Sequence, residues 1–276
     1  MIVLLRKLLT PFFFRYSILI EIFHVVHYYA GYIFYKYSVL FNKVYIGGYL
    51  SARQEIGRGR HKVLLNIIDL LIKEKKERGT TIEIMEIGSF CGESTIVMGN
   101  FLLKKNIPFK ITCVDIWNSF EAKSDSNFYS SKIQQNLKNG KVFKLFKHNI
   151  KNSGFSKNVK IIKENSNYAL KNIKKKFDLI FIDGSHSYSY VFNDIMNSKK
   201  KLNNNGYLVG DDYEISYSKT KHLNYPKLIK ENIDHIYDYK NKSVVHPGVT
   251  YAVNKIFGNI QSYNGLYIQK IKKRAL

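Results

Sequence analysis

The chain has 276 residues, of which 45% are hydrophobic and 14% aromatic. This is enough for one large globular domain with an appendage, too short for two full domains and too apolar for a disordered protein. The net charge of +23 favours anionic partners such as nucleic acid, an acidic glycan, a phosphate-linked sugar or an anionic membrane surface, although a general bias towards lysine would give the same charge without a specific partner.

Residues 1–60 are predicted to form an aromatic-rich helical extension that precedes one domain over residues 61–276. The longest uncharged run, residues 22–35, has the length of a buried or interfacial helix rather than of a membrane span. No secretory cleavage site follows a short apolar core, and two cysteines are too few for a disulfide framework, so we expect a cytoplasmic protein. We expect the extension to pack on the domain or at a homo-oligomer interface, and peripheral membrane contact is the alternative.

The remaining sequence alternates between strand-like and helix-like segments. Helices are expected over residues 61–77, 93–104 and 189–202, and strands over 82–87, 109–115, 159–163, 177–183 and 206–211. This alternation predicts a doubly wound, mostly parallel α/β sheet with helices on its faces. Segments 259–263 and 266–271 flank Asn264-Gly265, the residue pair that two-residue hairpin turns prefer. We therefore expect seven strands, closed by a C-terminal antiparallel hairpin.

A glycine loop follows the first predicted strand, with the pattern Glu86-x-Gly88-x-x-x-Gly92. Glycines let the backbone turn sharply and approach a ligand, and the order strand, loop, helix is typical of a nucleotide-binding corner. The middle glycine of the dinucleotide fingerprint is missing, which disfavours an NAD oxidoreductase. Glu86 is expected to orient loop amides or to bind an ammonium group.

Polar residues at the ends of the next two strands are candidate nucleoside ligands. Asp115 ends the second strand, where a carboxylate can accept both ribose hydroxyls, and the nearby Trp117 offers a flat face to an adenine. Asn165 and Ser166 follow the third strand, where hydrogen bonds to an adenine edge would form. The alternatives are that Asp115 caps the next segment, that Trp117 fills the core and that Asn165 and Ser166 belong to an ordinary turn.

Three carboxylates end the two following strands. Asp183 ends one and Asp211-Asp212 the other, so all three are expected at the carboxyl edge of the sheet, where ligands bind. Clustered carboxylates repel one another, and Mg²⁺ bound to their oxygens would neutralise them. Such an ion could chelate a substrate diol and lower the pKa of its hydroxyl, with His186 or Asp183 accepting the proton. The alternative is that the two later aspartates cap a turn and that His186 bonds to the backbone.

Five motifs resemble those of class I S-adenosylmethionine (SAM)-dependent methyltransferases, in the family 24-like group of macrocin- and novobiocin-type sugar O-methyltransferases and cephalosporin-hydroxylase-like proteins. They are E-x-G-x-x-x-G, V-D-x-W, F-I-D-G-S-H-S-Y, N-G-Y-x-x-x-D-D-Y and H-P-G-V-T-Y-A-V, and the resemblance covers roughly residues 83–257. It implies a SAM-binding domain, a sugar or small-molecule hydroxyl as acceptor and a divalent metal on Asp183, Asp211 and Asp212. The SAM contacts it implies are Glu86, Gly88, Ser89, Phe90, Gly92, Ser94, Asp115, Ile116, Trp117, Asn165 and Ser166. Relatives often have Asp where this chain has Asn254, and some have Asp where it has Ser185, which leaves acceptor choice and metal dependence open.

The sequence therefore predicts a SAM-dependent O-methyltransferase that acts on a sugar, glycan or small molecule, for example in polysaccharide biosynthesis. An RNA methyltransferase would suit the charge, but no N/D-P-P-Y motif or RNA-binding module is present, and no specific nucleic acid is expected as a partner. A third alternative is a non-catalytic nucleotide-binding or membrane-surface protein on a methyltransferase scaffold.

Overall fold

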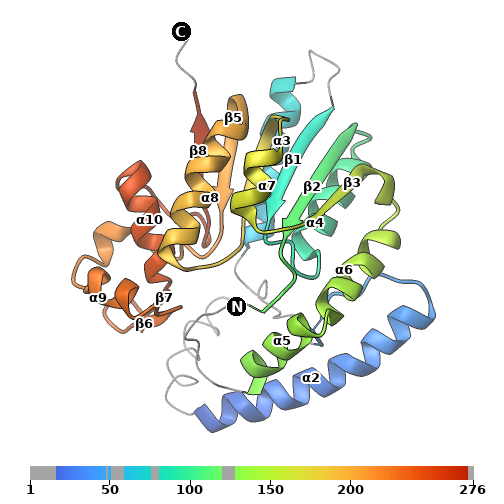
Figure 1. Cartoon of the computed structure of the whole chain (residues 1–276), viewed down its shortest axis with the longest axis horizontal. Coiled ribbons are helices and arrows are strands. Elements are labelled where there is room, and N and C mark those ends of the chain that lie inside the picture. The colour runs from blue at the N-terminus through green and yellow to red at the C-terminus, as the bar shows by residue number, and fades with distance from the viewer. Residues whose placement is uncertain (1–16, 48, 51–58, 76–80, 120–127, 273–276) are drawn as a thin grey trace.

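A computed structural model describes residues 17–47, 49–50, 59–75, 81–119 and 128–272. Its centre is a sheet of six strands in the order β3-β2-β1-β4-β5-β8 (Figure 1). The first five strands pair in parallel, and β8 pairs antiparallel to β5. The strands are β1 (Ile82–Ile87), β2 (Phe109–Asp115), β3 (Val159–Lys163), β4 (Phe177–Ile182), β5 (Leu202–Gly210) and β8 (Tyr267–Ile271).

The two faces of the sheet carry separate hydrophobic cores, because successive strand residues point to opposite faces. Ile84 of β1 and Leu179 of β4 belong to the first core, whereas Met85 and Ile180 belong to the second. β1 and β4 lie at the centre and read as near-continuous apolar runs, as strands buried on both faces do. The first core includes side chains of α3 (Arg60–Lys75), α4 (Glu93–Lys104), α5 (Phe128–Lys138) and α6 (Lys141–Lys151), and the second those of α7 (Ser166–Asn172), α8 (Tyr188–Lys201) and α10 (Pro247–Phe257).

The predicted α/β architecture is confirmed, with β1, β2, β3 and α4 at the expected bounds. The C-terminal hairpin differs from the prediction. Asn264 and Gly265 both have positive φ, at 55° and 91°, but the turn closes only the bridge between Tyr263 and Leu266. The preceding residues bond elsewhere: the carbonyl of Ile260 accepts from Tyr213 Oη at 3.1 Å. The described sheet therefore has six strands rather than seven.

A small lobe follows β5. It contains α9 (Tyr225–Lys230) and a two-stranded sheet of β6 (Ile236–Asp238) and β7 (Ser243–Val245), which lies below α10 in Figure 1. α10 begins directly after β7 and packs on α8. The lobe brings the polar loops around β6 and β7 to the ends of β4 and β5.

The described part of the N-terminal extension is the 24-residue helix α2 (Ser17–Leu40) and the segment that follows it. α2 packs on α5, with Tyr28 Oη accepting from Asn136 Nδ2 at 3.1 Å. After α2, Tyr45, Tyr49 and Leu50 join the first core. Among the helices that the structure describes, none combines the length and apolar character needed to cross a bilayer.

Candidate functional site

The candidate site lies at the carboxyl ends of β1, β2, β4 and β5. β1 pairs with β2 on one side and with β4 on the other, so the strand order reverses there. In open α/β sheets, ligands bind outside the carboxyl ends of the strands at this switch point. The glycine loop, Asp115 and the carboxylates after β4 and β5 all lie at this edge, as the sequence predicts.

The glycine loop passes close to the end of β4. Gly88 has φ +88°, and a Cβ built there would lie 2.0 Å from the carbonyl oxygen of Asp183. Gly92 has φ +87° immediately before α4, where a Cβ would lie 3.1 Å from Phe146. Both positions therefore require glycine, the first mainly for the close approach and the second mainly for its backbone conformation.

Glu86 is fully buried at the end of β1. Its carboxylate accepts hydrogen bonds from the hydroxyls of Ser94 and Thr95 in the first turn of α4. Burial raises the pKa of Glu86, against the hydroxyl hydrogen bonds that lower it. Glu86 thus accepts hydrogen bonds from hydroxyls of α4, and not from the loop amides that the sequence analysis expected it to orient.

Asp115 holds two loops together. Its Oδ2 accepts from the amide of Phe90 at 2.8 Å and its Oδ1 from the amide of Trp117 at 2.6 Å. Both donor residues have positive φ, at 45° and 44°, so the carboxylate fixes two sparsely populated backbone conformations. Burial raises the pKa of Asp115, and the two backbone hydrogen bonds lower it.

Trp117 occupies the core rather than an exposed face. Its side chain is 2% exposed, its ring lies 4.7 Å from that of Phe143 and 4.6 Å from that of Phe146, and its Nε1 donates to the carbonyl of Phe90 at 2.7 Å. The sequence alternative, in which this residue fills the core, describes the structure better than an adenine platform does. The neighbouring Ile116 is 44% exposed.

Asn165 and Ser166 lie beside Asp115, because the amide of Glu164 donates to the Asp115 carbonyl at 3.0 Å. Asn165 is the N-cap of α7, accepting from the amide of Asn167 at 3.0 Å. The Ser166 side chain lies near Asp194 of α8 and lowers the pKa of that carboxyl. Both side chains thus have structural contacts, and their predicted contact with an adenine stays a prediction.

Asp183, Asp211 and Asp212 come together as predicted, with one carboxylate oxygen of each within 4.8 Å of the others. Arg60, which the sequence analysis did not select, reaches into this cluster from the first residue of α3. Its guanidinium pairs with Asp211 and lies 3.8 Å from Asp183. Burial raises the pKa of Asp183 to about 7, with Asp212 adding to the increase and Arg60 opposing it. A long-range pair of this kind leaves no spacing pattern in the sequence.

Both ring nitrogens of His186 face carboxylates. Nε2 lies 2.8 Å from Asp212 and Nδ1 lies 2.9 Å from Asp234. Burial alone would lower the pKa of His186, but the two carboxylates raise it well above its usual value. This geometry describes an imidazolium that donates two hydrogen bonds, which is a poor proton acceptor, so Asp183 is the better placed of the two predicted bases.

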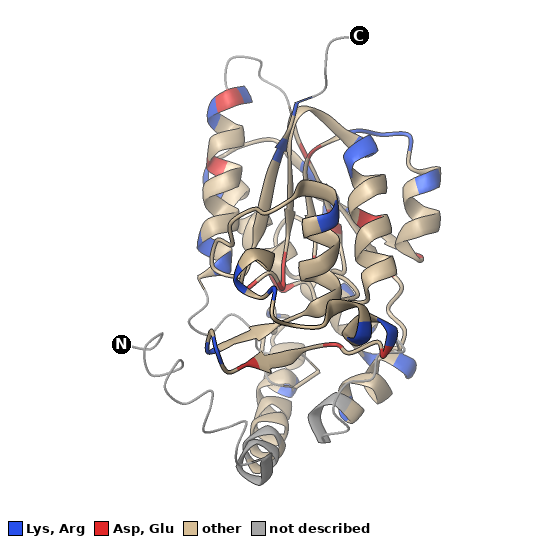
Figure 2. Cartoon of the chain, turned by 90° about the vertical axis from the view of Figure 1, so that its left-hand side faces the viewer, with Lys and Arg blue, Asp and Glu red and all other residues tan. Residues whose placement is uncertain are grey.

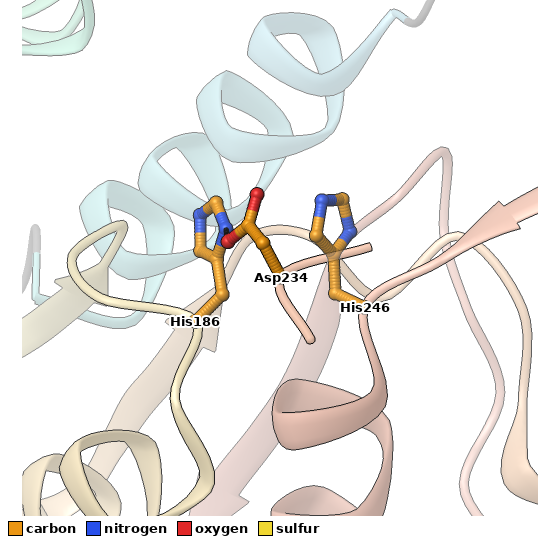
Figure 3. Close-up of side chains that lie close together, drawn as sticks. All are labelled: His186, Asp234 and His246. Atoms are coloured by element: carbon orange, nitrogen blue, oxygen red, sulfur yellow. Dashed lines mark hydrogen bonds and ion pairs between the residues drawn. The ribbon is translucent and has the colours of Figure 1, made fainter. Parts of the chain in front are cut away.

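The sequence analysis also missed three residues beside His186, namely Asp234, His246 and Glu214. Figure 3 shows Asp234 between the two imidazoles, whose ring centres are 4.7 Å apart. His246 Nδ1 lies 3.2 Å from Glu214 and 3.8 Å from Asp212. The H-P-G motif places His246 here, because a Cβ on Gly248 would lie 2.1 Å from the His186 carbonyl.

A water-sized cavity of about 10 Å³ lies beside the acidic cluster, lined in part by Asp183, His186, Asp211 and Asp212. A larger hollow of about 610 Å³ lies away from this edge, against β3 and α7, and five lysines are among its lining residues. Because the small cavity lies beside the clustered aspartates and His186, we place the candidate site there. The five lysines of the larger hollow are Lys110, Lys157, Lys160, Lys174 and Lys175.

Residues 85–213 match the family model Methyltransf_24, described as a methyltransferase domain. Over this span the chain is similar to a methyltransferase domain. The matched span runs from β1 to the residues just after β5, and so contains the glycine loop, Asp115 and the three clustered aspartates. The sheet order confirms the predicted doubly wound α/β fold, and the match agrees with the methyltransferase prediction for this domain.

Individual relatives of this chain are distant. The uncharacterized protein R132 of Acanthamoeba polyphaga mimivirus is 27% identical over 179 residues, which are 64% of this chain and 60% of R132. The chain thus covers less than two thirds of that relative. Among solved structures, S-adenosylhomocysteine (SAH)-bound PaMTH1 of Podospora anserina has a TM-score of 0.47 at 15% identity, covering 78% of each chain. The Bacillus cereus O-methyltransferase in complex with SAH has a TM-score of 0.41 at 16% identity, covering 75% of this chain and 70% of that one.

Arg60 is expected to be essential for the stability of this cluster. When divalent ions are chelated, Arg60→Gln should reduce the free energy of unfolding by about 3–5 kcal/mol, because it leaves buried carboxylates without their cation. Urea unfolding in EDTA measures this loss. The matched control is Lys73→Gln, which removes an exposed ion pair with Asp69 at 3.1 Å and should change stability little. Equal effects of the two substitutions would contradict the role given to Arg60.

Asp194 provides a pH-dependent prediction for the same region. Burial raises its pKa from 3.8 to about 6, although the nearby Ser166 side chain opposes the increase. The folded protein therefore binds the proton more tightly, and the stability that this carboxyl contributes is complete below about pH 4 and lost as the pH rises through 6. Between those limits the loss is about 3 kcal/mol. Urea unfolding from pH 4 to 7 should show Asp194→Asn gaining on the wild type as pH rises; parallel curves would contradict this.

Proposed function

We propose that this protein is a SAM-dependent O-methyltransferase that transfers a methyl group to a hydroxyl of a sugar, glycan or small molecule with the help of a divalent metal ion. The main support is that Asp183, Asp211 and Asp212 gather at the carboxyl edge of the sheet, with the backbone of Asp183 against Gly88 of the glycine loop. A methyl donor in that loop and an acceptor at the carboxylates would then be neighbours.

The methyl donor in this proposal is SAM. The match to a methyltransferase domain supports it, as do the tightly packed glycine loop, the buried Glu86 near the end of β1 and the half-buried Asp115 at the end of β2. The Asp115 oxygens each accept one loop amide, and each has a second lone pair with which to accept a ribose hydroxyl. The loops that Asp115 holds would thus be positioned before the nucleoside binds.

The acidic cluster suits a hard divalent cation such as Mg²⁺. It offers only carboxylate oxygens within 4.8 Å of one another, next to a cavity large enough for about one water-sized sphere. Arg60 already pairs with Asp211, so the guanidinium and the ion would share the negative charge of three aspartates. When bound, the ion would lower the pKa of a coordinated acceptor hydroxyl.

In this proposal, a side chain of the protein accepts the proton that the acceptor hydroxyl releases. The acceptor oxygen would transfer its proton to Asp183 and attack the sulfonium methyl, so that the methyl–sulfur bond breaks and the thioether product leaves. The side chain of Asp183 is 19% exposed, whereas that of Asp211 is 1% exposed, so Asp183 is the one that an acceptor can reach. His186, held between Asp212 and Asp234, would keep the Asp212 carboxylate in place.

The acceptor class is supported by charge. A net charge of +23 favours acceptors that carry phosphate or carboxylate groups, such as sugar nucleotides, acidic polysaccharides or lipid-linked glycans. A role in polysaccharide biosynthesis in the cytoplasm would follow from this acceptor class.

Methyl transfer from labelled SAM to a panel of sugar nucleotides and glycans tests the proposal. We expect transfer to at least one acceptor, and we expect chelation by EDTA to reduce it by at least about tenfold and excess Mg²⁺ to restore it, since a metal contributes several kcal/mol of charge stabilisation. SAM binding, measured by calorimetry, is the control and should be unchanged by EDTA. Transfer that EDTA does not alter would contradict the metal, and SAM binding without transfer to any acceptor would contradict the enzyme.

A further inference from the structure

An apolar stripe runs along the side of α2 that faces away from the protein. It consists of six residues at spacings of three or four, each between 50% and 74% exposed. The opposite side of the helix, at Tyr28, Gly31 and Ser38, is buried against the protein. We call the exposed residues the α2 stripe: Ile22, Val26, Tyr29, Ile33, Tyr37 and Leu40.

The exposed apolar surface is wider than this stripe. Tyr32 and Val39 flank it on one side and Phe34 and Phe41 on the other, and all four are between 39% and 67% exposed. The seam between two packed helices is narrow, with one or two apolar positions per turn. A helix that lies in a bilayer interface buries a broad apolar face. The width of the α2 surface therefore favours a lipid surface over a second helix.

Charge also separates the two occupants. The sequences of α2, α5 and α6, which lie together along one side of the molecule, contain seven lysines and one acidic residue, Glu21 (Figure 1). Lysine and arginine are spread over the other helices as well (Figure 2). Anionic lipid attracts such a surface, whereas a second copy of a chain with a net charge of +23 is repelled.

Two lysines beside the stripe are placed as in interfacial helices. Lys36 Nζ lies 5.4 Å from the ring centre of Tyr32, and Lys43 Nζ lies 5.5 Å from that of Tyr37. Tyrosine rings are enriched at the level of lipid headgroups, and lysine side chains extend from an apolar face towards the headgroup phosphates. We propose that the α2 stripe lies on an anionic lipid bilayer.

This contact would be joined directly to the candidate SAM-binding loop. The segment after α2 bonds to the glycine loop: Cys91 Sγ donates to the Leu50 carbonyl at 3.4 Å, and Asn149 Nδ2 donates to the carbonyls of Tyr45 at 2.9 Å and Cys91 at 2.8 Å. In Figure 1, α2 lies on the side towards which the parallel strands run, since the antiparallel β8 points the opposite way. A bound bilayer would therefore lie on the same side as the carboxyl edge of the sheet.

Vesicle sedimentation with the full chain tests the proposal. We expect the wild-type protein to sediment with phosphatidylcholine vesicles that contain phosphatidylglycerol, and much less with phosphatidylcholine alone. Val26→Ser/Ile33→Ser/Leu40→Ser should weaken the partition coefficient at least about tenfold, because tenfold corresponds to about 1.4 kcal/mol, less than burying one large apolar side chain provides. The matched control, Leu70→Ser/Leu103→Ser, changes residues of α3 and α4 that are 44% and 48% exposed and should bind like the wild type.

Three outcomes would overturn the proposal: no sedimentation of the wild-type chain with anionic vesicles, equal losses in the two variants, or a wild-type dimer in light scattering that the triple variant dissolves without any lipid binding. The last outcome would assign the stripe to a second copy. Circular dichroism checks that the variants fold, and the lipid dependence of the wild type tests the proposal without any variant. The proposal does not require methyl transfer, so an inactive protein that binds vesicles would contradict only the proposed function.

Discussion

Replacing Asp183 by asparagine is expected to lower the kcat of methyl transfer by at least about 100-fold, the effect typical of removing a positioned acid or base. Asparagine has nearly the same shape but cannot accept a proton, and it replaces a charged ligand oxygen in the proposed metal site. The side chain is close to Asp212 and Arg60, whereas its contact with the glycine loop is made through the backbone. SAM affinity should therefore change by no more than about threefold, which is below 1 kcal/mol.

The matched control for Asp183→Asn is Asp178→Asn. Asp178 is also buried on β4, but near the opposite end of that strand, where its carboxylate pairs with Lys75 at 2.5 Å. The control should lose stability and keep its kcat per folded molecule. Initial rates at saturating SAM and acceptor, with calorimetry of SAM binding, separate the two effects. Equal kcat values for the two variants would show that the acidic cluster has no part in the chemistry.

The central strands could be predicted from the sequence because their signals are local. Residues 82–87 and 109–115 are apolar runs bounded by turn residues, and the structure places β1 and β2 over the same residues. Parallel pairing then brings the ends of these strands to one edge whatever the details of packing, which is why the clustering of Asp183 with Asp211 and Asp212 was predictable. The hairpin was not, because its first segment bonds to the residues after β5 instead of to β8.

The charge balance of the site could not be read from the sequence. Arg60 pairs with Asp211 across about 150 positions of the chain, and Asp234 reaches His186 from a loop of the small lobe. Neither contact follows from a periodic pattern or a short motif. Trp117 could be located from the sequence, but its role could not. A single tryptophan near the end of a ligand-binding strand can either stack on a ligand or fill the core, and only its packing on Phe143 and Phe146 decides between the two.

The electrostatics of the cluster follow from these long-range contacts. Asp212 and Asp234 together hold His186 as a cation, while Arg60 sits against Asp211 and near Asp183. The cluster thus has two internal cations for its aspartates, yet burial still raises the pKa of Asp183 to about 7. Because burial makes an ionised carboxylate costly, a divalent cation beside Asp183, Asp211 and Asp212 would favour their charged forms.

Gly88→Ala should have the second large effect. A methyl group at this position would lie 2.0 Å from the carbonyl oxygen of Asp183, a backbone atom that cannot move without shifting the end of β4. Forcing alanine into φ +88° adds backbone strain of about 1–2 kcal/mol, and overpacking adds about 1–3 kcal/mol. We expect a loss of about 3 kcal/mol in the free energy of unfolding and a loss of SAM affinity of at least about tenfold, because the loop and the β4 end must separate.

Gly140→Ala separates these two causes. Gly140 has φ +68°, so alanine there meets the same kind of backbone strain, but a Cβ at Gly140 would have no atom within 4 Å. Its variant should lose only about 1 kcal/mol of stability and keep the SAM affinity of the wild type. Urea unfolding and calorimetry of SAM binding on both variants measure the difference. If the two substitutions cost the same, the contact between Gly88 and Asp183 would not constrain the site, and the glycine loop would owe its pattern to backbone conformation alone.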